Sequence, residues 1–358
     1  MRIRPRYLIV AILCLIAFVG GQWFFFKSRF EAALPQMEAR AAAMGLEIAY
    51  DARTIQGFPF RLEAHYTAVR IARTDPLLSF AVDAERAVVI RQLLGGDLSL
   101  VYMPAPKFAA AFASPLPRRR SGEVTLAFQA EAIHTSLRAD GQDIARISTV
   151  IEQPKGASTL LAIGDFSARQ LQFHLGWPIE GRSAPSGQMA TRLKTNIQVT
   201  DLALLGNDTG PLPSTLAQAE MGLDIDIPTY APLSPQGLSL WQQESGRARV
   251  RKLSASWGDV SIASAKGAIT LDDQLRPKGN ILLGVTGLAG LTYALDKTDI
   301  LAPGLEEPAL LTLRLLRAGK KAEDEVPLTF DIADAVLRLG PAPLVALGPV
   351  AILPSDPR

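Results

Sequence analysis

Asp224 and Asp226 form the pair of residues that comes nearest to a catalytic arrangement in this sequence. A spacing of two places both carboxylates on one face of a β-strand, a few ångströms apart, where they could share acid and base roles or bind calcium. The neighbouring sequence offers no further ligand for a metal ion. The pattern therefore favours a solvated strand face over a catalytic or metal-binding pair.

The three histidines, His65, His134 and His174, are scattered along the chain. None belongs to an H-E-x-x-H motif or stands near a cysteine, as the common zinc sites require. The sequence also contains no G-x-S-x-G elbow, no G-x-x-x-x-G-K-[ST] loop and no G-x-G-x-x-G turn. We therefore assign no catalytic, cofactor-binding or metal-ligating residue, predict no cofactor, and expect that the protein is not an enzyme.

The elements that position the rest of the chain begin with an apolar stretch at residues 7–26, which contains no charged side chain. A helix of that length is about 30 Å long, which matches the hydrocarbon core of a bilayer. A cleaved signal peptide is the alternative, but residues 19–21 (VGG) are the one passable cleavage site. Trp23 and the three phenylalanines that follow it are typical of a membrane interface. We predict a retained transmembrane anchor.

The basic residues around this stretch predict its orientation. Arg2, Arg4 and Arg6 precede it, whereas Lys27 and Arg29 follow it, and the excess favours a cytoplasmic N-terminus. Residues 1–6 would then form a cytoplasmic tip, and nearly all of the remaining chain would lie across the membrane. The one cysteine, Cys14, falls within the apolar stretch, so the exported part can form no disulfide.

Composition excludes one class of partner and favours one class of fold. A net charge of +2 with 20% charged residues gives no basis for nucleic-acid binding. The basic run at residues 118–120 lies in a loop, which is either simply solvated or in contact with anionic lipid headgroups. The 28 glycines and 25 prolines are spread along the chain, as expected of many short strands and turns.

Residues 27–45 predict a second, membrane-proximal helix. Phe30, Leu34, Met37, Ala41 and Met44 recur at helical spacing and would form one apolar stripe, packed on the folded domain or on a partner helix. A proline at position 35 is expected to kink this helix, and a glycine at position 45 to end it.

Residues 46–358 predict an exported, β-rich α+β domain. Its long, twisted and mainly antiparallel sheet could be groove-like, and residues 182–188 mark a possible internal boundary. Apolar residues alternate along several segments: Val124, Leu126, Phe128 and Ala130; Leu193, Thr195, Ile197 and Val199; Leu223, Ile225 and Ile227; and Ile281, Leu283 and Val285. Such one-sided strands need a cover, which could be a helix, a second sheet or an apolar ligand.

Short helices are expected at residues 215–221, 288–295 and 308–317, and an extended tail after Gly340. Trp257 would end one strand, with Gly258 starting the turn to the next. Gly267 interrupts the alternation in that next strand and predicts a β-bulge. Residues 272–279 would then connect to a further strand.

Several segments together carry a family resemblance. They are residues 57–63 (GFPFRLE), 240–243 (LWQQ), 253–258 (LSASWG), 267–272 (GAITLD), 276–279 (RPKG), 326–330 (VPLTF) and 339–341 (LGP). With them, nearly the whole chain resembles the bacterial domain-of-unknown-function family numbered 2125, which is found in cell envelopes. The motifs are strand and turn signatures, so no family site residue carries over.

The rhythm of strands and turns is also similar, more loosely, to that of AsmA-like and YdgA-like envelope proteins. The AsmA-like group is linked to outer-membrane assembly and to lipid passage along a β-groove. The resemblance implies a bacterial inner-membrane protein, single pass, with its bulk in the periplasm.

The function expected from all of this is non-enzymatic: binding or transferring a lipid-like molecule, or supporting envelope assembly. Inner membrane, lipid and envelope proteins are the expected partners, and nucleic acid is not. The alternative is a structural or protein-interaction module, and a hydrolase is disfavoured because the sequence shows no catalytic constellation.

Overall fold

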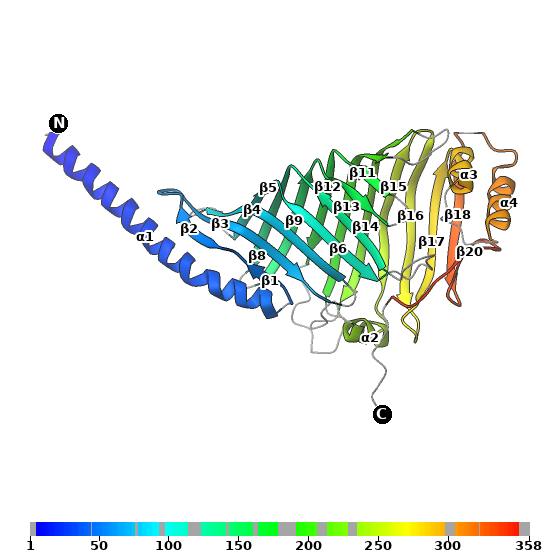
Figure 1. Ribbon diagram of the computed structural model, residues 1–358, viewed down its shortest axis with the longest axis horizontal. Coiled ribbons are helices and arrows are strands. Elements are labelled where there is room, and N and C mark those ends of the chain that lie inside the picture. Colours follow the sequence, from blue (N-terminus) through cyan, green and yellow to red (C-terminus); the bar gives the residue numbers. More distant parts are fainter. Residues whose placement is uncertain are drawn as a thin grey trace, which may run out of the picture.

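The fold was analysed in a computed structural model, which describes residues 5–43, 45–75, 78–92, 97–113, 123–140, 143–159, 164–177, 191–205, 213–227, 235–297, 305–321 and 323–350. One large antiparallel sheet dominates it, with one long helix at one end and two short helices at the other (Figure 1). The chain is therefore β-rich, as the sequence predicts.

The helices are α1 (Pro5–Ala43), α2 (Pro235–Gln243), α3 (Leu288–Lys297) and α4 (Glu306–Arg317). The strands are β1 (Glu47–Ala49), β2 (Ala52–Gln56), β3 (Arg61–Arg73), β4 (Leu78–Gln92), β5 (Leu98–Pro104), β6 (Lys107–Ala113), β7 (Glu123–Gln129), β8 (Ala132–Asp140), β9 (Asp143–Glu152), β10 (Lys155–Ser158), β11 (Gly164–Ser167), β12 (Gln170–Gly176), β13 (Thr191–Leu205), β14 (Thr215–Ile227), β15 (Ala248–Trp257), β16 (Val260–Leu271), β17 (Pro277–Thr286), β18 (Val326–Ala333), β19 (Val336–Leu339) and β20 (Ala342–Ala346).

These strands form a simple antiparallel meander. Five pairs of short strands (β1 with β2, β5 with β6, β7 with β8, β9 with β10, and β11 with β12) are the two halves of single rows, because both members pair with the same neighbouring row. The twenty described strands thus make fifteen rows, and each row pairs with the next along the chain. The candidate boundary at residues 182–188 lies outside the described residues, but the strands on either side of it, β12 and β13, are hydrogen-bonded neighbours.

Helix α1 joins the predicted anchor and the predicted second helix into one continuous element that runs through Pro35. Its first half is exposed: Leu15, Ile16 and Phe18 each expose about 60% of their surface. In the part of the chain that the structure describes, α1 is the one helix long and apolar enough to cross a membrane. Length and composition alone support that assignment.

The second half of α1 packs on the first rows of the sheet. Phe30, Leu34 and Ala41 of the predicted stripe are buried, whereas Met37 is 44% exposed and Met44 lies outside the described residues. Trp23 extends the stripe toward the N-terminus, and its indole Nε1 donates a hydrogen bond to the backbone carbonyl of Arg61 at 3.2 Å. The buried side of α1 covers an apolar cluster formed by β3, β4, β5 and β8.

A crease crosses the sheet in this region, at the same level in row after row. At each crossing the alternation of apolar and polar side chains slips, so that two polar or small residues stand between apolar ones. The pattern is seen in Tyr66-Thr67-Ala68-Val69, Ala84-Glu85-Arg86-Ala87, Ile151-Glu152-Gln153-Pro154 and Val199-Thr200-Asp201-Leu202. The pairing register is the same on both sides of the crease, because no row gains a residue relative to its neighbour there.

On every second row, the slip coincides with a residue in the left-handed backbone conformation. Ala68, Ala105, Gln153 and Asp201, which lie on alternate rows, have φ angles of 51°, 45°, 48° and 51°. Tyr66 and Val69, on opposite sides of the crease, belong to the same buried cluster. An unbroken strand would put residues three apart on opposite faces, so the left-handed residue is what keeps the apolar face continuous.

Small and rigid residues fill the buried side of the crease. Pro106, Ala130, Pro154 and Ala168 stand side by side on four successive rows, and all four are buried. Backbone hydrogen bonds continue between these rows, from Ala130 N to Pro106 O at 3.1 Å and from Ala168 N to Pro154 O at 2.9 Å. Proline has no N–H to donate, and in these hydrogen bonds Pro106 and Pro154 serve only as acceptors. The backbone hydrogen bonds therefore continue through the bend.

The far end of the sheet has its own core. Leu310 and Leu313 of α4 and Leu288 at the start of α3 cover Val285 and Leu328 on the last long strands. The helices expected at residues 288–295 and 308–317 are confirmed by α3 and α4. The four predicted runs of alternating apolar residues are likewise confirmed as parts of β7, β13, β14 and β17.

Three expectations were wrong in detail. Residues 215–221 form the first half of β14 rather than a helix, because pairing with β13 overrides the helix propensity of Ala217, Gln218 and Met221. Gly267 is not a bulge: it pairs in register with Val250, and a Cβ there would lie 2.2 Å from the carbonyl oxygen of Asn280. The register shift of β16 lies between Ala263 and Ala265 instead. The connection after β16 is also shorter than predicted, since β17 already begins at residue 277.

The crease predicts opposite effects of glycine at neighbouring positions. In the full chain, Ala105→Gly with Gln153→Gly should raise the free energy of unfolding by about 0.5–1 kcal/mol, because glycine adopts positive φ without a Cβ clash. The matched control is Lys107→Gly with Lys155→Gly, two exposed strand positions on the same rows. It should lower stability by a similar amount. Thermal unfolding of the detergent-solubilised protein measures both, and a loss of stability in both variants would contradict the role given to the left-handed residues.

Candidate functional site

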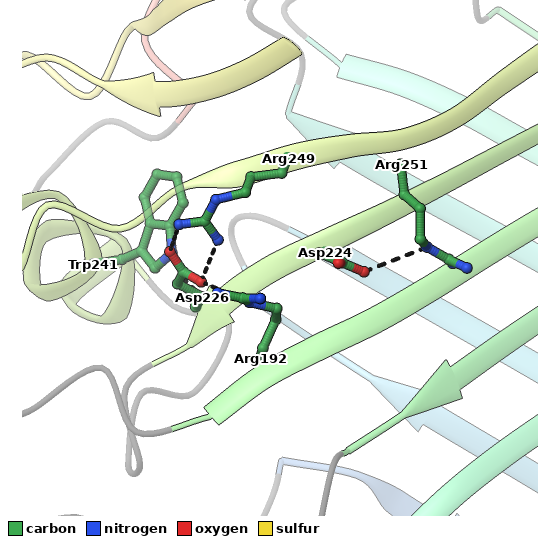
Figure 2. Close-up of polar contacts among 6 residues, drawn as sticks. All are labelled: Arg192, Asp224, Asp226, Trp241, Arg249 and Arg251. Carbon is green, nitrogen blue, oxygen red and sulfur yellow. Dashed lines mark hydrogen bonds and ion pairs between the residues drawn. The ribbon is translucent and has the colours of Figure 1, made fainter. Parts of the chain in front are cut away.

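The predicted pair Asp226 and Asp224 lies near the end of β14, where each carboxylate faces arginines (Figure 2). Both Asp226 oxygens accept hydrogen bonds from the Arg249 guanidinium, at 2.7 and 2.9 Å. Arg192 Nε lies 3.6 Å from the same carboxylate. The Trp241 indole of α2 donates to the backbone carbonyl of Asp226, which ties the helix to the strand end. Both oxygens of the Asp226 carboxylate are therefore used in the ion pair with Arg249.

Asp224 is held differently. Its Oδ1 lies 3.4 Å from Arg251 Nε, within ion-pair distance, but it accepts no hydrogen bond from the described residues. Arg251 is the extra residue of a β-bulge, because Gly222 pairs with Lys252 and Leu223 with Val250. The same guanidinium donates to the carbonyl of Thr195 at 3.0 Å. The bulge thus turns Arg251 toward the polar face that carries Asp224.

The electrostatics of the pair are those of a salt-bridge network. The hydrogen bond to Asp226 raises the pKa of Arg249, and the charges of Asp226 and Asp224 act in the same direction, while partial burial opposes them. Farther along the same two strands, Lys252 of β15 and Glu220 of β14 form another ion pair at 2.5 Å. Each aspartate lies within ion-pair distance of an arginine on β15, Asp226 of Arg249 and Asp224 of Arg251. Such an arrangement fixes strands β13, β14 and β15 and α2 relative to one another.

The three histidines do not converge. His65 Nε2 lies 2.8 Å from Glu63 Oε2, and His134 Nε2 lies 3.7 Å from Glu152 Oε1. His174 Nε2 lies 3.2 Å from Gln172 Oε1. Burial, and then the charge of Arg146, lower the pKa of His174, so its ring is neutral near pH 7. The residues that the structure describes contain no group of three or more histidine, cysteine or acidic side chains positioned to hold a metal ion.

The opposite face of the sheet carries the more distinctive feature. Between the α1 cluster and the α3–α4 cluster, a run of apolar residues on β12, β13, β14 and β15 is only half-buried. We call them the uncovered strip; it comprises Leu171, Phe173, Leu175, Leu193, Ile197, Val199, Met221, Leu223 and Leu253. Direct register pairing places them on one face: Phe173 is opposite Ile197, Ile197 opposite Met221, and Met221 opposite Leu253.

None of the described helices covers this strip. Figure 1 shows α1 at one end of the sheet, α3 and α4 at the other, and α2 at the margin of the middle strands. The strip is continuous with both covered ends. Ile151 packs against the α1 cluster and against the cluster around Phe128, and Ile262 packs against the α3–α4 cluster. The alternating apolar residues predicted this face, but not which part of it a helix would leave open.

Comparison with known proteins finds one relationship. The model of a family described as uncharacterized and conserved in bacteria (DUF2125) matches residues 23–348. The match begins at Trp23, the first buried residue among those of α1 whose side chains the structure describes. No curated protein and no solved structure matches the chain.

The two aspartates offer a matched test of the network. Asp226→Asn should lower the free energy of unfolding by about 1–2 kcal/mol, because it removes a doubly hydrogen-bonded charge from Arg249. Asp224→Asn should change it by less than about 0.5 kcal/mol, since Asp224 makes only a long ion pair. Thermal unfolding of the two full-length variants measures the difference. Equal losses would contradict the distinct roles derived from the geometry.

Proposed function

Because this chain belongs to the bacterial family DUF2125, whose description names no activity, we propose a function from the structure itself: the protein is a membrane-anchored, non-enzymatic binder of lipid acyl chains. The single observation that carries the proposal is the uncovered strip. Apolar side chains there form a continuous face across β12, β13, β14 and β15, which the described helices leave open.

Burial energetics favour an apolar occupant. Each square ångström of apolar surface removed from water contributes about 25 cal/mol, so a face several side chains long gains several kcal/mol when it is covered. Contiguous apolar surface that a fold leaves only partly covered is a common feature of binding surfaces. A fatty acyl chain is long and narrow, which matches a strip one face wide that crosses several strands.

The anchor supplies the source of such a ligand. Helix α1 carries the exposed apolar segment at its N-terminal end and packs with its other half on the first rows of the same apolar face. A phospholipid of that membrane would therefore meet the sheet at its α1 end. The occupant of the strip that we favour is an acyl chain from the bilayer that holds the helix.

The polar groups support binding over catalysis. Asp226 is paired with Arg249, Lys252 with Glu220, and the histidines are dispersed. General acid–base chemistry needs a group that can exchange its proton near a substrate, and these carboxylates are committed to ion pairs.

The same proposal includes a compartment. We propose a cytoplasmic N-terminus, a single pass through the bacterial inner membrane, and a periplasmic sheet. The arginines at positions 2, 4 and 6 support this orientation through the positive-inside rule.

Orientation is tested with reporters. Alkaline phosphatase fused after residue 358 of the full chain should be active in cells, because that enzyme matures only outside the cytoplasm. The same reporter fused before residue 1 should be inactive. Reversed activities would overturn the compartment while leaving the acyl-binding surface to be tested separately.

Lipid binding is tested by photo-crosslinking at adjacent positions on opposite faces of one strand. Benzoylphenylalanine at position 173, on the uncovered strip, should form lipid adducts in cells that mass spectrometry detects on the purified chain. The matched position is 172, one residue along β12, which lies on the other face. Equal adduct yields at 172 and 173 would contradict specific binding on the strip.

A variant pair gives a second measure. Phe173 and Ile197 are directly opposite each other, as are Gln172 and Gln198 on the other face. Phe173→Asp with Ile197→Asp should reduce co-purified lipid at least fivefold, because charges on the strip exclude hydrocarbon. Gln172→Asp with Gln198→Asp should leave it unchanged. Thermal unfolding shows whether both variants keep the fold, and unchanged lipid in a folded strip variant would overturn the proposal.

A protein-interaction module is the second candidate. The observation that favours it is the outer side of α4, where Leu311, Leu315 and Leu316 are 56%, 66% and 38% exposed. Under this alternative, the crosslinker at position 173 would attach to a protein rather than to lipid.

A further inference from the structure

The turn between β2 and β3 is an exposed aromatic tip. It consists of Phe58, Pro59 and Phe60, with no polar side chain among them. Phe58 is 56% exposed and Phe60 is 76% exposed, the highest value among the large apolar residues of the described chain. Gly57 permits the tight turn with a φ of 101°, since a Cβ there would lie 2.7 Å from the carbonyl oxygen of Arg61.

This tip lies directly beside α1. The rings of Phe58 and Trp23 meet edge to face with centroids 5.4 Å apart, and the Trp23 indole donates to the Arg61 carbonyl just after the tip. The Trp23 and Phe24 rings also meet edge to face, with their centroids 5.2 Å apart. The hairpin and the helix therefore meet in one aromatic cluster, at the point where α1 passes from exposed to packed.

The level of this cluster along the helix follows from the apolar segment. Trp23 is three residues before the end of the stretch at residues 7–26, which is about 4.5 Å along a helix axis. A bilayer that surrounds that stretch must place Trp23 just inside its outer boundary, which is the preferred depth of tryptophan. The tip that touches Trp23 has to lie at the same depth.

Cations lie next to the cluster, and two of them follow the apolar segment along α1. Lys27 Nζ lies 5.6 Å from the Trp23 ring centroid, and the Arg29 guanidinium lies 5.2 Å from that of Phe25. Arg61, at the base of the tip, is 62% exposed. Aromatic rings at the end of an apolar helical segment, with cations just beyond them, are the arrangement expected at the headgroup layer of a membrane.

We propose that the Phe58–Phe60 tip inserts into the outer interface of the same bilayer as α1, as a second membrane contact of the protein. The sheet is then held at two points, the helix and the hairpin, so it cannot swing freely about α1. This inference rests on the anchoring part of the proposed function and does not depend on what binds the uncovered strip.

The test places spin labels in the full-length chain in phosphatidylethanolamine and phosphatidylglycerol vesicles. Cys14, the only native cysteine, reports on the anchor itself. Phe60→Cys in a Cys14→Ser background reports on the tip. Asp259→Cys in the same background is the control, at an exposed turn between β15 and β16. Accessibility to oxygen, which concentrates in lipid, is compared with accessibility to a water-soluble nickel complex.

We expect labels at positions 14 and 60 to favour oxygen over nickel by at least threefold, and the label at 259 to favour nickel. A tip label as open to nickel as that at 259, with the anchor label still in lipid, would overturn the inference alone. A tip label shielded from both reagents would indicate a protein contact and would also overturn it. An anchor label in water would overturn the anchoring on which both proposals rest. Phe58→Cys repeats the measurement should the Phe60 variant unfold early.

Discussion

An antiparallel sheet satisfies its own backbone hydrogen bonds but cannot cover its own apolar face, and the structure is organised around that limit. At the first rows the cover is α1, whose Phe30 and Leu34 are buried against the sheet. At the last rows it is α3 and α4, with Leu288 and Leu313. Between them the described helices provide none. The free energy of the middle rows therefore depends on what else lies on the strip, and this links the fold to the proposed binding role.

The crease is what makes a single long face possible. Without positive φ at Ala68, Ala105, Gln153 and Asp201, the slip in alternation would send apolar residues on one side of the crease to the polar face. The α1 cluster would then end at Tyr66 instead of continuing to Val69. Each left-handed alanine, glutamine or aspartate is less favourable than glycine at that angle, so the burial on the far side has to outweigh this local cost.

The sequence predicted the elements better than their arrangement. Alternation in β7 and in the part of β13 before Thr200, together with helical spacing in α1, gives local signals that a long pairing surface preserves. Residues 215–221 misled because Ala, Gln and Met favour a helix when considered alone, whereas two neighbouring strands fix their conformation. Family membership was also recognisable from short segments, which the structure places in turns, in strands and in α2.

The sequence predicted only part of the candidate site, for a physical reason. Asp224 and Asp226 could be placed on one strand face, but their arginine partners come from other rows. One of these arginines, Arg251, lies in a bulge that no local sequence pattern predicts. Ion pairing between rows depends on register, and register is a property of the assembled sheet. The same holds for the uncovered strip, because the extent of a cover depends on where distant helices begin and end.

Register also explains how a meander of this length can remain one structure. Every row pairs with its sequence neighbour, so adding or removing a hairpin would change the length of the sheet without changing its topology. The crease restricts that freedom, because Pro106, Ala130, Pro154 and Ala168 must stay side by side. A slip of one residue in any of these rows would replace a small buried residue by a neighbour such as Lys107 or Lys155. The buried column of proline and alanine therefore fixes the register of these rows, and with it the continuity of the apolar face on which a hydrocarbon chain could lie.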